Sequence, residues 1–96
     1  MRKVLVVDDE FLVRVGIKSF LNWEENGYTI IGEAADGRQA LEIMEREAPD
    51  VVLTDLKMDG MDGFELIQVS RKRFPAVQFV VLSSFEDGEN VKRAMK

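Results

Sequence analysis

Three aspartates stand directly after stretches that the sequence predicts to be buried strands. Asp8 and Asp9 follow the apolar run at residues 4–7, and Asp55 follows the run at residues 51–54. The carboxyl ends of parallel strands meet at one edge of a sheet, where open α/β folds bind their ligands. Three carboxylates at such an edge repel one another, and a divalent cation relieves that repulsion. Oxygen ligands with positions left for water suit Mg²⁺, which joins protein carboxylates to a phosphate.

A fourth polar group, the Ser83 hydroxyl, follows the apolar run at residues 78–82 and would reach the same edge. There it could donate a hydrogen bond to a phosphoryl oxygen carried by Asp55. A simpler role is also open to these residues, because Ser and Asp often cap the helix that follows them. For Asp8 and Asp9, the third carboxylate favours metal binding over capping.

The composition excludes several other kinds of site. With no cysteine and no histidine among its 96 residues, the chain has no disulfide, no thiolate or histidine zinc site, and no Ser–His or Cys–His catalytic pair. A net charge of −5, with Lys and Arg scattered along the chain, argues against a nucleic-acid surface in this chain. No apolar run reaches the length of a membrane span, and the first is too short for a signal peptide, so a cytoplasmic protein is expected.

Alternating strands and helices are predicted to position these side chains. The strand runs are residues 4–7, 28–34, 51–54 and 78–82, and the helical stretches are residues 11–21, 38–47, 64–74 and 86–96. Strict alternation with short connections predicts a parallel sheet with helices on both faces, which is a doubly wound α/β fold. We expect one domain over residues 1–96, because this length suffices for one small core.

Hydrophobic spacing predicts which side of each helix faces the sheet. The helix at residues 11–21 carries a wide apolar stripe, with Arg14 and Lys18 outside it. We expect its inner face to be Leu12, Val15, Gly16 and Ser19, flanked by Val13, Ile17, Phe20 and Leu21. In the helix at residues 64–74 we expect buried positions at Phe64, Ile67 and Phe74. Two further expectations are an N-cap at Asp36, and close backbone packing or a bulge at Gly32.

Four short motifs resemble the receiver domain of two-component response regulators. They are VVDDE after the first strand, TD at the end of the third, MDGMDGFEL after it and LSS at the end of the fourth. They follow in the family's order from Val4 to about Lys96, so the resemblance covers the whole chain. The stretches DDEFLVRVGIK and IIGEAADG further resemble receivers attached to AraC-type DNA-binding domains. The resemblance implies a flavodoxin- or CheY-like sheet with strand order 2-1-3-4.

By this resemblance, Asp55 is the nucleophile that takes a phosphoryl group from the phosphohistidine of a histidine kinase. Asp9 and Asp55 would ligate Mg²⁺ directly and Asp8 mainly through water, and the backbone carbonyl of Lys57 would be a further ligand. Ser83 would hydrogen-bond the phosphoryl group as the switch residue. The phosphoryl oxygens would also accept hydrogen bonds from the backbone amides near Leu56, Lys57 and Ser84.

The resemblance also implies an output for the phosphorylated form. The fourth helix, together with the absent fifth strand and last helix, would carry the signal, and the face of the fourth helix is a candidate homodimer contact. An output domain outside this chain, expected to bind DNA and regulate transcription, would make any contact with nucleic acid. We expect no contact with a membrane.

Three features bear on how closely the chain follows the family. Asp59 stands where proline is usual, which frees a φ angle and adds negative charge beside the site. The fifth strand, with its conserved lysine and switch aromatic, and the last helix are absent, so we expect the receiver domain to be C-terminally incomplete here. Lys57 and Phe85 occupy the variable positions that flank the path of the hydrolytic water, and bulky Phe85 is expected to prolong the life of the aspartyl phosphate.

Two other functions are compatible with parts of the pattern. A pseudo-receiver would serve as a docking or dimerisation module without phosphorylation, and a failure to take up phosphate would support it. A phosphatase of the haloacid dehalogenase type also uses an aspartate nucleophile and Mg²⁺. It would need that nucleophile on the first strand and a second Asp two residues later, whereas position 10 is Glu.

Overall fold

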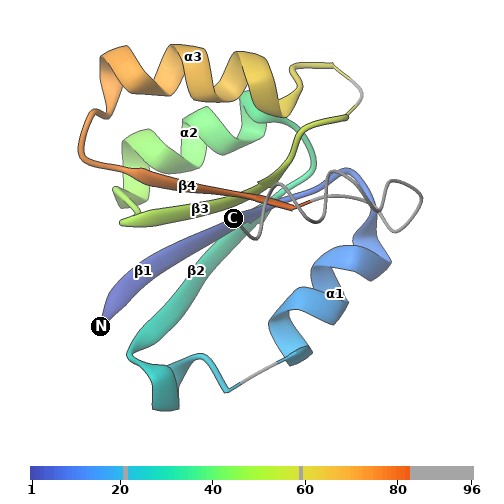
Figure 1. Ribbon diagram of the computed structural model, residues 1–96, viewed down its shortest axis with the longest axis vertical. Coiled ribbons are helices and arrows are strands. Elements are labelled where there is room, and N and C mark those ends of the chain that lie inside the picture. The colour runs from blue at the N-terminus through green and yellow to red at the C-terminus, as the bar shows by residue number, and fades with distance from the viewer. Residues whose placement is uncertain (21, 59, 83–96) are drawn as a thin grey trace.

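The computed structural model describes residues 1–20, 22–58 and 60–82 (Figure 1). Strands and helices alternate along these residues, as predicted. The elements are β1 (Arg2–Val7), α1 (Phe11–Phe20), the 3₁₀ turn η1 (Glu24–Asn26), β2 (Tyr28–Ala34), α2 (Gly37–Glu47), β3 (Val51–Asp55), α3 (Gly63–Arg73) and β4 (Gln78–Leu82). The helix predicted at residues 86–96 lies outside the described residues. No described helix combines the length and the apolar character needed to cross a membrane.

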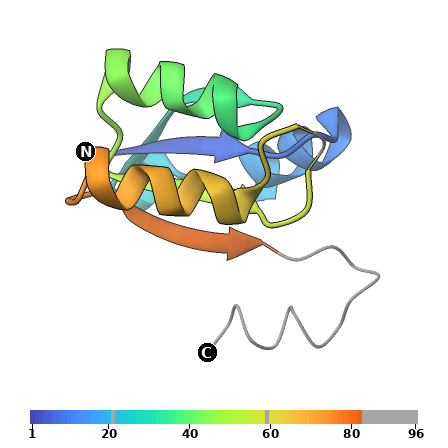
Figure 2. The same ribbon diagram turned by 90° about the horizontal axis from the view of Figure 1, so that it is seen from above.

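The described strands form one parallel sheet in the order β2-β1-β3-β4, which confirms the predicted order. Figure 2 shows β4 at one edge of this sheet. The pairing of β1 with β2 is irregular at one point, because Val4 pairs with Ile30 while the next residue, Leu5, pairs with Gly32. Ile31 is therefore an extra residue in β2, and the bulge expected near Gly32 is confirmed.

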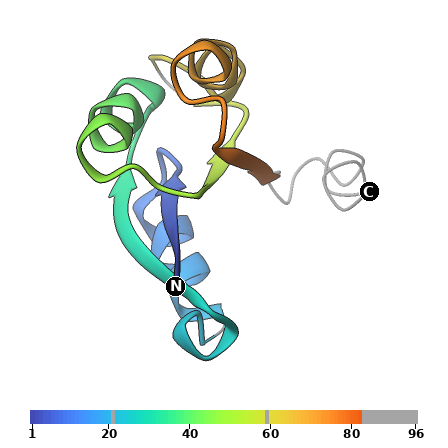
Figure 3. The same cartoon turned by 90° about the vertical axis from the view of Figure 1, so that its left-hand side faces the viewer.

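The main core lies between the sheet and the helices α2 and α3, which are side by side on one face (Figure 3). Successive side chains of a strand point to opposite faces, so Leu5 and Val7 of β1 face these helices. With them, the buried members of this cluster are Ala34, Ala40, Leu41, Met44, Val52 and Leu66. α2 begins at the predicted N-cap, where the Asp36 side chain accepts a hydrogen bond from the Gln39 amide.

The opposite face of the sheet carries α1 and a smaller cluster, whose buried members are Val4, Val6, Val51 and Leu53. Ile17 of α1 packs against it together with Trp23 and Tyr28. The two aromatic rings meet edge to face with centroids 6.2 Å apart, and the Trp23 indole donates a hydrogen bond to the Ile17 carbonyl. Trp23 and Tyr28 thus pack just beyond the first helix.

The predicted inner face of α1 is wrong. Leu12 is 78% exposed and no residue of α1 is fully buried, while Ile17, placed beside the predicted face, is the residue that contacts the core. The cause lies in the sequence itself, because apolar residues occupy most of the circumference of this helix. A helical period then fits more than one orientation, and contacts with the sheet select among them.

One buried position in α3 was also predicted wrongly. Phe64 is 58% exposed, whereas Leu66 is fully buried and Ser70, one turn further on, is buried with it. The inner face therefore follows Gly63, Leu66 and Ser70 rather than the aromatic residues. The Ser70 hydroxyl is accommodated by a long contact of 3.8 Å to the Met44 sulfur.

Candidate metal and phosphoryl site

The carboxyl edge of the sheet brings the predicted aspartates together. β1 and β3 are neighbours with Val7 opposite Thr54, so the residues that follow, Asp8 and Asp55, leave the sheet side by side. Carboxylate oxygens of Asp8, Asp9 and Asp55 lie within 4.8 Å of one another. We call these three residues the acidic trio. The grouping predicted from the strand ends is present in the structure.

The members of the acidic trio differ in exposure. Asp8 is buried, with 4% of its surface exposed, whereas Asp55 is half-buried and Asp9 is exposed. Burial raises the pKa of the Asp8 carboxyl, and the negative charges of Asp55, Asp9 and Glu10 raise it further. The Glu10 amide, which donates to Asp8 Oδ1 at 2.9 Å, acts in the opposite direction on this pKa. The net effect is an upward shift, so ionised Asp8 is held in an unfavourable environment.

Among the described residues, no Lys or Arg side chain forms an ion pair with the acidic trio. Their ion pairs lie elsewhere, joining Arg14 and Lys18 to Glu33, Arg46 to Glu47, and Arg73 to Glu45. Closely spaced carboxylates that lack a counter-charge are a donor set suited to a hard divalent cation. The set is open on the Asp9 side, which leaves positions for water and for a phosphate oxygen. The residues present therefore fit Mg²⁺.

The backbone holds Asp55 tightly in place. Its carbonyl oxygen accepts a hydrogen bond from the Thr54 hydroxyl at 2.9 Å, and the first residue of α3, Gly63, packs directly against it. A Cβ atom at Gly63 would lie 2.2 Å from that oxygen and 2.9 Å from the Leu56 Cα, so only glycine fits there. The Lys57 amide points back toward the carboxylate and donates to Asp55 Oδ1 at 3.3 Å. An amide in this position is available to an anion bound at Asp55.

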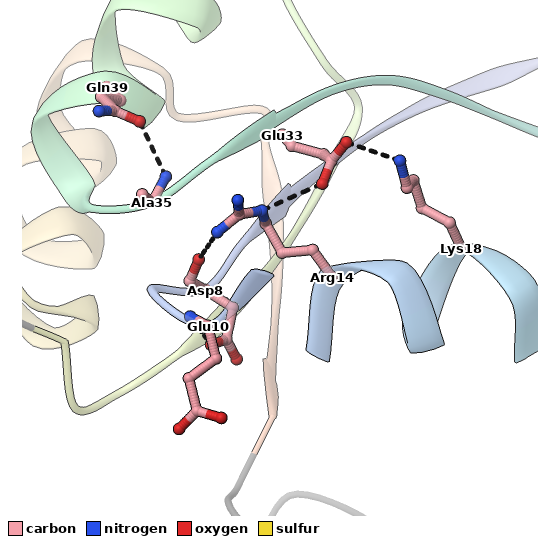
Figure 4. Close-up of polar contacts among 7 residues, drawn as sticks. All are labelled: Asp8, Glu10, Arg14, Lys18, Glu33, Ala35 and Gln39. Carbon is pink, nitrogen blue, oxygen red and sulfur yellow. Dashed lines mark hydrogen bonds and ion pairs between the residues drawn. The ribbon is translucent and has the colours of Figure 1, made fainter. Parts of the chain in front are cut away.

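A second carboxylate group near this edge was missed by the sequence reasoning, which placed Arg14 and Lys18 merely outside the apolar stripe. Arg14 Nε pairs with Glu33 Oε1 at 3.0 Å, and Lys18 Nζ pairs with Glu33 Oε2 at 2.6 Å (Figure 4). We call these three residues the paired cluster. The hydrogen bonds from Lys18 and Arg14 lower the pKa of Glu33. One sequence signal could have indicated this cluster, namely that Glu33 is the only charged residue in strand β2.

The paired cluster contacts the acidic trio at one point. The Arg14 guanidinium also donates a hydrogen bond of 2.6 Å from Nη1 to the backbone carbonyl of Asp8 (Figure 4). Other predicted members of the site, Ser83 and Ser84, lie outside the described residues, as do Asp59 and Phe85. The backbone amides of Leu56 and Lys57 lie in the described loop that follows Asp55.

Comparison with known proteins identifies relatives along the whole chain. The family model described as the response regulator receiver domain matches residues 4–96. The uncharacterized transcriptional regulatory protein YesN of Bacillus subtilis is 44% identical over 96 residues, which cover all of this chain and 26% of YesN. The chain therefore spans about a quarter of that relative's length.

Solved structures agree with this family assignment. The receiver domain of AraT, a response regulator from Geobacillus stearothermophilus, matches with a TM-score of 0.85 and 34% identity, over 98% of this chain and 73% of that one. A two-component transcriptional regulator AraC from Clostridium phytofermentans matches with a TM-score of 0.82 and 36% identity, over 100% of this chain and 74% of that one.

Proposed function

The chain belongs to the response regulator receiver domain family, and from that premise we propose that Asp55 accepts a phosphoryl group from the phosphohistidine of a histidine kinase. The acidic trio supports this proposal above all, because it sets a half-buried carboxylate beside two others with no neutralising side chain among the described residues. A carboxylate oxygen of Asp55 would attack the phosphorus, forming a P–O bond as the P–N bond to the kinase histidine breaks. The released ring nitrogen takes up a proton from solvent, so the products are an aspartyl phosphate and a neutral histidine.

The metal that this proposal requires is Mg²⁺. Asp9 and Asp55 would hold it directly, Asp8 mainly through water, and the Lys57 backbone carbonyl would complete the protein ligands. When bound, Mg²⁺ would offset the negative charge of the carboxylates and of the incoming phosphoryl oxygens. Carboxylate oxygens of the acidic trio already lie within 4.8 Å of one another, which supports this assignment.

Backbone amides and hydroxyls would bind the phosphoryl oxygens. The Lys57 amide, which donates to the Asp55 carboxylate at 3.3 Å, would turn to the new phosphoryl group, and the Leu56 amide would assist. We assign the Ser83 hydroxyl and the Ser84 amide to the same task. A hydrogen bond gained by Ser83 only in the phosphorylated state would favour that state, which is how a local contact shifts a two-state equilibrium.

We further propose that phosphorylation controls an output domain outside this chain that binds DNA and regulates transcription. Supporting this, YesN and the Clostridium phytofermentans protein are both named as transcriptional regulators. Residues 1–96 would form the receiver domain of a cytoplasmic protein, continued by a fifth strand and a last helix beyond this chain. The face of residues 86–96 would carry the signal and serve as the homodimer contact.

The test is the intact mass of the full-length protein after incubation with acetyl phosphate and Mg²⁺, with Asp55→Asn in parallel. We expect one phosphoryl adduct in the wild type, none without Mg²⁺ and none in Asp55→Asn. An adduct that persists in Asp55→Asn would move the acceptor to another residue. A wild-type protein that takes up no phosphoryl group would instead support a docking or dimerisation module.

A further inference from the structure

We propose that Arg14 is a positioning residue for the acidic trio, holding Asp8 where Mg²⁺ binding needs it; the proposal rests on the function proposed above. Arg14 belongs to α1 but bonds outside its own helix in two directions. Its Nη1 donates to the Asp8 carbonyl at 2.6 Å, and its Nε pairs with Glu33 of β2 at 3.0 Å (Figure 4). A planar guanidinium can hold both partners at once in a fixed geometry.

The backbone amide and the backbone carbonyl of Asp8 are both linked to β2, one directly and the other through Arg14. The Asp8 amide donates directly to the Ala34 carbonyl at 3.0 Å, and the Asp8 carbonyl is linked through Arg14 to the neighbouring residue, Glu33. The far side of the loop is held by the backbone, since the amide of residue 14 donates to the Glu10 carbonyl at 3.2 Å, and this bond does not depend on the side chain at that position. The direction of the Asp8 side chain depends on this backbone, because Asp8 follows the last residue of β1.

Without metal, repulsion within the acidic trio favours a loop in which Asp8 moves away from Asp55. A buried Asp8 that is close to two other carboxylates is stable in this position only while its backbone is held. The side chain of Arg14 is 15% exposed, so its bonds are partly shielded from water and salt. Arg14 therefore keeps Asp8 in position for the cation even when no cation is bound.

Position and charge predict opposite effects when Arg14 is replaced. As a positive charge beside a cation site, Arg14 weakens Mg²⁺ binding, so its removal would tighten binding if charge alone mattered. As a support for Asp8, its removal should weaken Mg²⁺ binding by roughly tenfold to a hundredfold, the usual cost of losing a partner that orients a metal ligand. Arg14→Lys separates the two effects, since it keeps the charge but loses the fork that reaches Asp8 and Glu33 together.

The experiment is a calorimetric titration of the intact protein with Mg²⁺ alone, comparing wild type, Arg14→Gln and Arg14→Lys. Lys18→Gln is the matched control, because Lys18 pairs with Glu33 as Arg14 does but makes no contact with Asp8. We expect both Arg14 variants to bind Mg²⁺ at least about tenfold more weakly and Lys18→Gln to bind it within about twofold of wild type. Unchanged or tighter binding by Arg14→Gln would overturn the proposal, as would wild-type affinity in Arg14→Lys.

A second measurement separates positioning from a general loss of stability. Glu33 is linked to Asp8 only through Arg14. The variant Glu33→Gln should therefore weaken Mg²⁺ binding in the wild-type background and have no further effect when Arg14→Gln is already present. Additive effects of these two substitutions would contradict the proposal. If Arg14→Gln does not fold, Arg14→Lys takes its place in the cycle.

A metal-free readout separates this proposal from the proposed function. In the absence of Mg²⁺, amide hydrogen exchange at Glu10, whose amide bonds the Asp8 carboxylate, should accelerate in Arg14→Gln and not in Lys18→Gln. Unchanged exchange would overturn the role of Arg14. A wild-type protein that binds no Mg²⁺ would instead overturn the proposed function, whatever the exchange rates are.

Discussion

Two sites near the same edge of the sheet, the paired cluster and the acidic trio, give their carboxylates opposite surroundings. Glu33 receives two cationic partners, Arg14 and Lys18, and its pKa is lowered by them. Asp8, at the end of the neighbouring strand, is buried beside two other aspartates, and its pKa is raised by burial and by their charge. The fold has cations available at this edge, yet it directs them to Glu33. The difference indicates that the paired cluster supports the structure, whereas the acidic trio holds carboxylates whose repulsion a bound cation would relieve.

The two groups are also held by different means. Backbone packing places Asp55, whose carbonyl oxygen contacts Gly63 and the Thr54 hydroxyl. Two ion pairs hold the Glu33 carboxylate, and the more exposed of them, to Lys18, can rearrange at little cost. Substitutions that disturb the backbone of the acidic trio should therefore have larger effects than removal of Lys18.

The largest effect is expected for Gly63→Ala. Its Cβ would lie 2.2 Å from the Asp55 carbonyl oxygen, so the start of α3 and Asp55 must separate, at a cost of about 3 kcal/mol of unfolding free energy. Phosphoryl uptake at Asp55 should fall as well. Gly16→Ala is the control, because a Cβ there meets nothing within 4 Å and alanine should stabilise α1 by roughly 0.5–1 kcal/mol. Urea unfolding of both variants measures the contrast, and equal costs would contradict it.

Asp8→Asn should next reveal the repulsion stored in the acidic trio. We expect Mg²⁺ to bind at least about tenfold more weakly, while the unfolding midpoint of the metal-free protein rises. Because the pKa of Asp8 is raised in the fold, its ionised form destabilises the protein at neutral pH, and this cost fades as the pH falls through the raised pKa and is gone below the ordinary aspartate range. The gain from Asp8→Asn should shrink in the same range. A metal-free variant less stable than wild type at neutral pH would show that Asp8 carries no such cost.

Glu33→Gln should have a smaller effect, with the opposite sign. The folded pKa of Glu33 is lowered, so ionised Glu33 stabilises the fold above its ordinary pKa and loses this contribution as the pH falls through the folded value. The variant should therefore lose up to about 1 kcal/mol at neutral pH and match wild type in acid. Thermal unfolding across that pH range measures the difference. A constant difference at all pH values would assign the effect to packing.

The smallest effect should come from Lys18→Gln, which leaves Glu33 with Arg14 as a partner. We expect a loss of a few tenths of a kcal/mol that disappears at high salt, because the Lys18 side chain is 38% exposed. Arg46→Gln removes an even more exposed pair with Glu47 and should have no measurable effect. Denaturant unfolding at low and high salt compares the two. A salt-independent loss in Lys18→Gln would mean that its aliphatic chain, and not its charge, supports the fold.

The acidic trio could be predicted from the sequence because it depends only on where strands end. Once residues 4–7 and 51–54 are taken as neighbouring parallel strands, Asp8 and Asp55 must emerge together. The paired cluster could not be predicted in this way. It depends on the rotation of α1, whose apolar residues surround most of the helix, and that rotation is set by contacts between Ile17 and the sheet. The exposure of Phe64 has a similar origin, since packing of Leu66 decides the phase of α3.

The extra residue in β2 decides which layer of the protein receives a negative charge. Counting from the pair Val4–Ile30, a regular strand would set Glu33 opposite Val7, whose side chain lies in the core beneath α2 and α3. Because Ile31 is bulged out of the pairing, Glu33 is instead opposite Val6 and shares the α1 face with Arg14. A bulge of one residue reverses the in–out parity of everything after it. Deletion of Ile31 would close the bulge and keep Glu33 opposite Val6, whereas regular pairing of Ile31 with Leu5 would send a carboxylate into the apolar core and leave Arg14 without its partner.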